Sequence, residues 1–260
     1  MPVHLHATPA ITHRFSYDDY CSLLWELSRS FSGVRHETIG SSAGGRSLYA
    51  LSIGGEGDLP SVLYAGADWL SAAVLIRFLT EYSTLLAEGG RMYRVHLPAL
   101  FAGRRILVCP VLNPDAMEPG LCRSGTVGLT NAVGADIASF FTDSPDAPPE
   151  KCPEAMALRQ YFLFAEASMF CLLTGGEVDG LQIPVQPSSR AGTVGRLLAR
   201  MLTSSVTPAD SAVLSVPAWY AAETGHPAYG VTLGITEEET CFHRAYAAVR
   251  ELLYSAPLLV

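Results

Sequence analysis

Lysine is almost missing from this chain of 260 residues: Lys151 is its one lysine, and every other basic side chain besides histidine is arginine. Charged residues make up 16% of the chain, against about 25% in an average soluble domain. The formal net charge is −8, which argues against a protein that binds nucleic acid through its phosphates. A surface so poor in charge is compatible with a homo-oligomer.

Cysteine pairs of the C-x-x-C type are absent although the chain has 6 cysteines, so a zinc knuckle or thioredoxin-like motif is excluded. The even count leaves disulfides open, but no secretion signal favours them. No run approaches the ~18 uninterrupted apolar residues of a membrane helix. We therefore expect a cytoplasmic protein without a membrane segment. Cys109 and Cys171 are predicted to be buried thiols in adjacent central strands and not disulfide partners.

Several common catalytic motifs are also absent. The glycine runs at 54–57 and 175–176 do not continue into a phosphate-binding loop, and there is no Gly-x-Ser-x-Gly nucleophile elbow. Among the 7 histidines, only His4 and His6 have the close spacing of zinc ligands, and they lie near a chain end. The acidic run Glu237–Glu239 is interpreted as the exposed start of a helix.

What the chain does contain is a regular alternation of strand-like and helix-like segments. Strands are predicted at Val34–Ile39, Leu48–Ile53, Ser61–Ala65, Arg104–Leu112, Ser168–Leu173 and Tyr229–Ile235. Helices are predicted at Tyr17–Phe31, Leu70–Leu86, Pro153–Ala165, Arg190–Leu202, Pro217–Glu223 and Thr240–Tyr254. This order predicts an α/β fold in which a mixed, twisted central sheet carries helices on both faces. Residues 1–260 are expected to form a single domain, with Thr142–Lys151 as a surface loop within it.

Seven segments, read in order from residue 17 to about residue 253, resemble the zinc carboxypeptidase family, and the first of them is YDDY at 17–20. They are most similar to its bacterial branch, which cleaves γ-D-glutamyl-diaminopimelate bonds in cell-wall peptides. The sequence IGSSAGGRSLYAL at 39–51 resembles the family's IGxSxxGRxIYAL, and VLYAGADWLS at 62–71 resembles VLYVGAHHGMEWIT. The others are VLNPD at 111–115 for PMVNPDG, GADI at 134–137 for GVDLN, PAWY at 217–220 for GYKDWF, and YGVTLG at 229–234 for FTIEVG.

The resemblance implies the fold of that family, with a zinc-carboxypeptidase-like, phosphorylase/hydrolase-like architecture, and it implies where zinc would be bound. Family members hold the ion with the His and Glu of an H-x-x-E motif and a second, distant His, and another Glu activates the bound water. Here the H-x-x-E positions fall on Ala65 to Asp68 or on a shortened version, and no histidine lies between His36 and His96. At best, Asp68 replaces the glutamate ligand.

At the remaining family positions, the catalytic and substrate-binding side chains are replaced as well. The second histidine falls on Leu173 and the catalytic glutamate on Thr232, whose hydroxyl is far too weak a base. The residues that bind the substrate carboxylate fall on Ala138 and Ser139. We therefore predict that the chain binds no zinc and has no carboxypeptidase activity, and that Leu173 fills the former metal space and joins the core.

Other motif residues are retained. Arg46 keeps its place in the strand pair, and Asn113, Pro114, Asp115 and Asp136 are expected to shape turns. In the family, the aspartate at the position of Asp136 orients a zinc-bound histidine, and here it has no such histidine to orient.

The degenerate motifs indicate an inactive relative, kept as an assembly module or as a module that binds a peptide or cell-wall fragment. The alternative is a weak metallopeptidase that cleaves γ-D-glutamyl or C-terminal peptide bonds with relocated ligands. Such a site would combine Asp68 with Glu177, Asp179 or a histidine near the chain start. A purely structural subunit of an oligomer is the third hypothesis.

Overall fold

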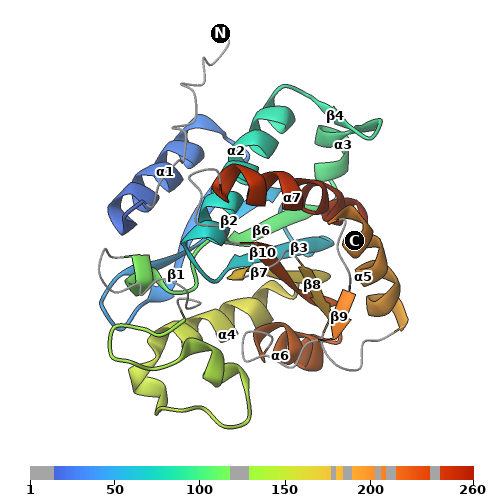
Figure 1. Ribbon diagram of the computed structural model, residues 1–260. Helices are drawn as coiled ribbons and strands as arrows, with labels where there is room; N and C mark the ends of the chain where they lie inside the picture. The colour runs from blue at the N-terminus through green and yellow to red at the C-terminus, as the bar shows by residue number, and fades with distance from the viewer. Residues whose placement is uncertain are drawn as a thin grey trace.

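An eight-stranded mixed sheet forms the centre of the molecule in the computed structural model (Figure 1). The structure describes residues 15–117, 129–176, 180–183, 189–202, 206–208, 215–234 and 241–260. In spatial order the strands are β1 (Val34–Ser41), β2 (Ser47–Gly54), β6 (Arg105–Cys109), β3 (Ser61–Gly66), β7 (Met169–Gly176), β10 (Ala228–Gly234), β8 (Gly180–Ile183) and β9 (Val206–Pro208). A separate two-residue ladder joins β4 (Arg91–Met92) to β5 (Val95–His96).

The four central strands, β6, β3, β7 and β10, run parallel to one another. All six residues of β3 are buried, as expected of a parallel strand that is covered on both faces. The β1–β2, β2–β6 and β10–β8 pairs are antiparallel, whereas β8 and β9 are parallel. The sheet is therefore mixed, and the predicted fold class is confirmed.

Helices cover both faces of the sheet, each over its own apolar cluster (Figure 1). One face carries α1 (Tyr17–Ser30), α2 (Trp69–Ala87), α3 (Leu97–Phe101), α5 (Ser189–Met201) and α7 (Cys241–Ser255). The other carries α4 (Pro153–Ala165), α6 (Ser215–Thr224) and the 3-10 helix η2 (Ile137–Phe141). Three shorter 3-10 turns are η1 (Pro114–Met117), η3 (Pro149–Lys151) and η5 (Ala256–Leu258).

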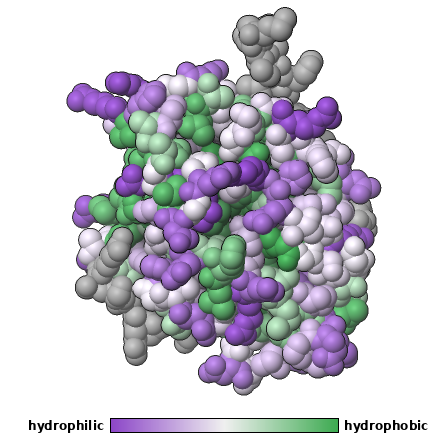
Figure 2. All heavy atoms as spheres, turned by 180° about the vertical axis from the view of Figure 1, so that it is seen from behind, coloured by the Kyte–Doolittle hydropathy of each residue, from purple (hydrophilic) through white to green (hydrophobic). Residues whose placement is uncertain are grey.

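The helix α2 is the central helix of its layer. It begins after the N-cap Asp68 and ends before Gly89, whose positive φ of 66° is the usual helix stop. By length and composition it is the one helix in the described ranges that could cross a membrane, but 67% of its apolar window is buried within the fold. That burial is typical of a core helix. On the surface, Figure 2 shows apolar and polar residues interspersed over the back of the molecule.

Two expectations about the central strands need correction. The strand predicted to run to Leu112 ends at Cys109, because Pro110 has no N–H for the ladder. Cys109 and Cys171 are buried free thiols, as predicted, but their strands are not adjacent: β3 lies between β6 and β7. β3 thus lies between β6 and β7 in the sheet, although it precedes both of them in the sequence. Cys21 and Cys152 are free as well, and the side chains of Cys122 and Cys241 lie outside the described part.

A buried carboxylate connects the β1–β2 turn to the segment that follows β6. Asp115 is 1% exposed and accepts hydrogen bonds from Ser42 Oγ (2.6 Å), from the backbone N–H groups of Gly44 (3.0 Å) and Ala132 (3.2 Å), and from Arg46 Nη1 (2.9 Å). Burial alone would raise the pKa of Asp115, but the hydrogen bonds from Ser42 and Arg46 and from the two amides outweigh it and the pKa is lowered. The retained motif residues Arg46 and Asp115 thus join the β1–β2 turn to the segment that follows β6.

We expect Asp115→Asn to lower the free energy of unfolding by about 2 to 4 kcal/mol at pH 7, because it breaks a buried ion pair. A lowered pKa stabilises the fold above the unfolded-state value, about pH 4, and this contribution is lost as the pH falls through the folded-state pKa. The gap between wild type and variant should therefore narrow below about pH 4. Urea unfolding of wild type and variant at pH 7 and at pH 3 measures the loss of stability and how far it narrows in acid.

Glu56→Gln is the matched control for Asp115→Asn. It removes an ion pair with Arg35 whose side chains are 44% and 85% exposed, so the expected change is below about 1 kcal/mol. An equal loss of stability in both variants would contradict the role assigned to Asp115.

Candidate functional site at the carboxyl edge of the sheet

The predicted site positions lie on three neighbouring strands, at the edge where the parallel strands end. Ala65 is on β3, Leu173 on β7 and Thr232 on β10, and Asp68 lies two residues after the end of β3, as the N-cap of α2. In the ladders, Gly66 pairs with Leu173, and Leu173 pairs in turn with Val231. The carboxyl edge of a parallel sheet is where α/β proteins usually bind their ligands. The structure therefore brings these four positions to one edge.

Their side chains nevertheless leave the sheet on different faces. Thr232 pairs with Thr174, whereas Leu173 pairs with Val231, and successive residues of a strand point to opposite faces. Leu173 belongs to the cluster beneath α2 and α7, while Ala65 belongs to the cluster beneath α4 and α6. Ala65 and Leu173 therefore do not point toward a common centre.

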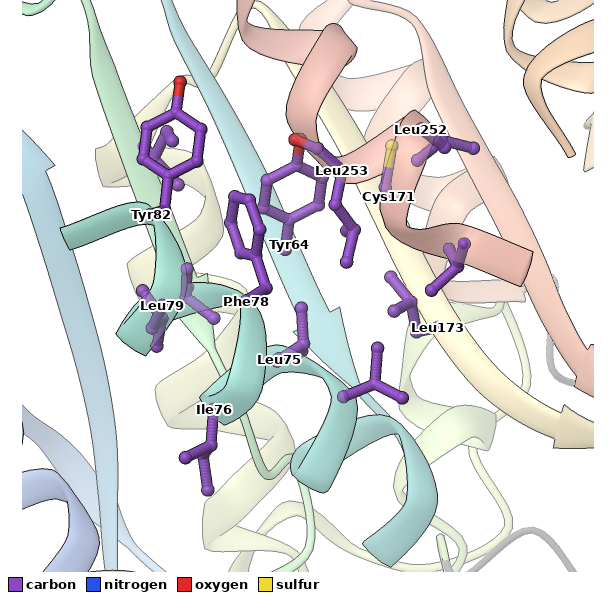
Figure 3. Close-up of a cluster of buried hydrophobic side chains, with 14 of the residues drawn as sticks. Tyr64, Leu75, Ile76, Phe78, Leu79, Tyr82, Cys171, Leu173, Leu252 and Leu253 are labelled. Atoms are coloured by element: carbon purple, nitrogen blue, oxygen red, sulfur yellow. The ribbon is translucent and has the colours of Figure 1, made fainter. Parts of the chain in front are cut away.

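Leu173 is part of the hydrophobic core. It is fully buried, and Figure 3 shows it directed into the cluster that also holds Tyr64 of β3, Leu75 of α2 and Leu252 of α7. A leucine in such a cluster supplies apolar contacts and no ligand atom. Leu173 joins the core, as predicted, but it points to the opposite face of the sheet from Ala65 and so does not fill a space that these two positions share.

Both carboxylate oxygens of Asp68 are engaged in holding the backbone. Its Oδ1 accepts from the Ser71 N–H at 2.9 Å and from Ser71 Oγ at 3.1 Å, which closes the first turn of α2. Its Oδ2 accepts from the N–H of Gly175 at the end of β7. Burial raises the pKa of Asp68 although these hydrogen bonds oppose it. Asp68 therefore acts as a helix cap and as a bridge between β3 and β7.

The positions expected to bind a substrate carboxylate lie on η2. Asp136 caps this turn, because its Oδ1 accepts from the N–H of Ala138 at 3.0 Å. The hydroxyl of Ser139 donates to the Asp136 carbonyl (2.8 Å) and to Asp146 Oδ1 (2.7 Å). Burial and the nearby charge of Asp146 raise the pKa of Asp136. Because Asp136 and Asp146 lie beside Ser139, this position is poorly suited to binding the carboxylate of a substrate.

The remaining retained residues are structural. Asn113 donates from Nδ2 to the carbonyl of Thr130 at 2.8 Å, and Pro114 begins η1 beside the buried Asp115. Glu154, which the motifs did not single out, is also buried and accepts from the Ala43 N–H at 2.7 Å. It extends the connection between α4 and the β1–β2 turn.

Within the part of the chain that the structure describes, the donor set at this edge does not fit a zinc ion. A catalytic zinc site takes about three protein ligands, and the described residues contain no group of three His, Cys, Asp or Glu side chains that could hold a metal. Asp68, the one carboxylate that the described residues place at this edge, is already committed to Ser71 and Gly175. The alternative ligands Glu177, Asp179, His4 and His6, like the run Glu237–Glu239, lie outside the described residues.

Sequence reasoning missed the bridge to Gly175. The spacing of Asp68 and Ser71 is that of a capping box, and this signal alone would have identified Asp68 as a helix cap. The Gly175 amide lies 107 residues further along the chain, and no local pattern indicates such a partner.

The fold is similar to that of solved metallocarboxypeptidases. The chain matches solved metallocarboxypeptidases from Pseudomonas aeruginosa (TM-score 0.73, 14% identity) and Burkholderia cenocepacia (0.72, 13%), in each case over 94% of this chain and 69% of the other. In sequence it is 27% identical to the human carboxypeptidase N catalytic chain over 146 residues, which is 52% of this chain and 32% of that protein. No protein-family model matches. The chain has a metallocarboxypeptidase-like fold, and the resemblance inferred from its motifs is confirmed.

The bridge predicts the outcome of two substitutions at Asp68. Asp68→Ala removes the helix cap and leaves the Gly175 amide without its acceptor, so the free energy of unfolding should fall by about 2 to 4 kcal/mol. Asp68→Ser keeps a capping oxygen but is too short for Gly175, so the expected loss is about half as large. Thermal or urea unfolding of the two variants measures the difference, and a harmless Asp68→Ala would refute the structural role.

Because Leu173 lies in the core, we expect a histidine at this position to destabilise the fold. Leu173→His places an imidazole in an apolar cluster and should reduce the free energy of unfolding by about 3 kcal/mol. Leu173→Met keeps the volume and should reduce it by less than about 1.5 kcal/mol. If the two variants unfold at the same urea concentration, Leu173 does not pack as described.

Proposed function

We propose that this protein is a catalytically inactive relative of the metallocarboxypeptidases, kept as a module that binds a peptide or cell-wall fragment or that takes part in an assembly. The observation that carries the proposal is the core position of Leu173, where the resemblance places the second zinc-binding histidine. The capping role of Asp68 supports it, because a carboxylate with both oxygens engaged is a poor metal ligand.

The chemistry of the remaining positions supports the same proposal. Family enzymes depend on the metal to generate hydroxide near neutral pH and to stabilise the oxyanion. Thr232 stands at the position of the catalytic glutamate, and its hydroxyl cannot accept a proton near neutral pH. Hydrolysis of an amide by this chain should therefore stay near the uncatalysed rate.

Intact scaffold residues around altered catalytic positions favour a retained binding role. Asp115 and Asp136 still support the loops that border the edge, through the hydrogen bonds described above. The proposal includes a cytoplasmic location and no nucleic-acid, membrane or zinc partner, in line with the acidic, charge-poor composition.

Metal content and turnover, measured on one preparation, test the proposal. The protein is dialysed against Zn²⁺, its bound metal is quantified by mass spectrometry, and hydrolysis of a γ-D-glutamyl-diaminopimelate peptide and of a C-terminal peptide substrate is followed. We expect less than stoichiometric zinc and no turnover, with an active metallocarboxypeptidase as the positive control. Calorimetric titration with the same peptides tests the binding role, and the heat of binding should not change when a chelator is added.

Turnover that a chelator abolishes would overturn the proposal in favour of a hydrolase with relocated ligands. In that case, alanine variants of Glu177 and Asp179 would identify the ligands by their loss of zinc. Absence of both turnover and peptide binding would leave assembly as the retained role.

A further inference from the structure

The strand β1 forms one edge of the central sheet. Within the described residues its one strand neighbour is β2. It is eight residues long, and Arg35, Glu37 and Thr38 are exposed. An edge of this length presents a row of backbone N–H and C=O groups that can pair with another strand.

The direction of the outward backbone groups follows from the residue that begins the strand. The N–H of Val34 donates to the carbonyl of Phe31 at 3.0 Å, so it points away from β2. Because backbone groups alternate along a strand, the N–H and C=O of His36 also point away from β2, whereas those of Arg35 and Glu37 point toward it. His36 is therefore the natural centre for pairing with a further strand.

Exposed aromatic side chains flank this edge on both faces of the sheet. On the α1 face, the Trp25 ring lies edge-on to His36 with 4.8 Å between the ring centroids, and Trp25 is 55% exposed. On the other face, α4 packs so closely that a Cβ at Gly40 would collide with Ala157. Phe164 is 87% exposed and lies two helical turns beyond Ala157, on the same side of α4. Figure 1 shows α1 and α4 on either side of β1.

We propose that two copies of this chain associate through their β1 strands, antiparallel and about a two-fold axis at His36, so that one sheet runs through both copies. In this register the two His36 residues face each other as a hydrogen-bonded pair. Arg35 of each copy then lies opposite Glu37 of the other, and opposite charges across a strand pair are favourable. The sequence Arg35-His36-Glu37 is thus complementary to itself.

The aromatic residues give this pairing its apolar area. A two-fold operation brings α1 beside the second α1 on one face and α4 beside the second α4 on the other. Trp25, which lies beside His36, and Phe164 are then covered by the second copy, and buried aromatic side chains contribute strongly to such contacts. Within one copy, Arg35 forms an ion pair with Glu56, and both side chains are exposed. Such an exposed ion pair is weak, so it hardly hinders Arg35 from pairing with Glu37 of the second copy.

Sedimentation equilibrium tests the proposal on the full-length protein, which should sediment as a dimer that dissociates on dilution. Arg35→Glu or Glu37→Arg alone places like charges opposite each other twice per dimer and should raise the dissociation constant about tenfold. The double variant R35E/E37R restores opposite charges and should return the constant to within about threefold of wild type. Trp25→Ala and Phe164→Ala should each raise it by about 30-fold or more.

Leu197→Ala is the matched control. Leu197 is also an exposed apolar residue, 40% exposed, but it lies on α5, which packs beside β8 and β9 at the far end of the strand order from β1, so its variant should dimerise as wild type does. Circular dichroism confirms that each variant is folded. Hydrogen exchange at the His36 amide should slow as the protein concentration rises. Two results would overturn the proposal. The protein could remain a monomer at a concentration of about 100 µM, at which even a weak specific dimer would form. Alternatively, the dimer could be weakened by Leu197→Ala and not by the variants at the β1 edge.

Discussion

The carboxylate of Asp68 holds together the part of the molecule on which the rest depends. It closes α2, the most deeply buried helix, and it fixes the end of β7 through the Gly175 amide. The turn between β3 and α2 is also tight, because a Cβ at Gly66 would collide with the carbonyl oxygen of Pro110. In this chain the carboxyl edge of the parallel strands is used to join a helix to the sheet through this carboxylate.

Much of the fold could be predicted because the elements concerned carry strong local signals. The helix α4 begins and ends where its proline and its apolar spacing indicated, and the central strands were recognisable as uninterrupted apolar runs. The strands β8 and β9 escaped prediction, since segments of four and three residues show too little alternation. The order of strands escaped it as well, because crossover connections and not local pattern placed β3 between β6 and β7.

The candidate site shows the same division. The expectation that the zinc-binding histidines and the catalytic glutamate are replaced came from the residues at the matched positions, and the burial of Leu173 follows from its apolar strand. The directions of Leu173 and Thr232 were not predictable from the motifs, because they depend on the parallel register of β7 and β10. The second partner of Asp68 depends on a contact between distant segments. Motifs thus predicted which chemistry is absent, and only the tertiary structure indicated which contacts Asp68 and Leu173 make.

A single hydrogen bond near the end of the chain bears on how the protein is made. The hydroxyl of Tyr64, in the middle of the sheet, donates to the carbonyl of Leu253 at 2.9 Å across 189 residues. The helix α7 also supplies much of the cover for β10 and α2. During synthesis, β3 and α2 leave the ribosome long before the helix that covers them. Until α7 has been synthesised, the nascent chain therefore carries an uncovered apolar surface, the condition under which chaperones engage a growing polypeptide.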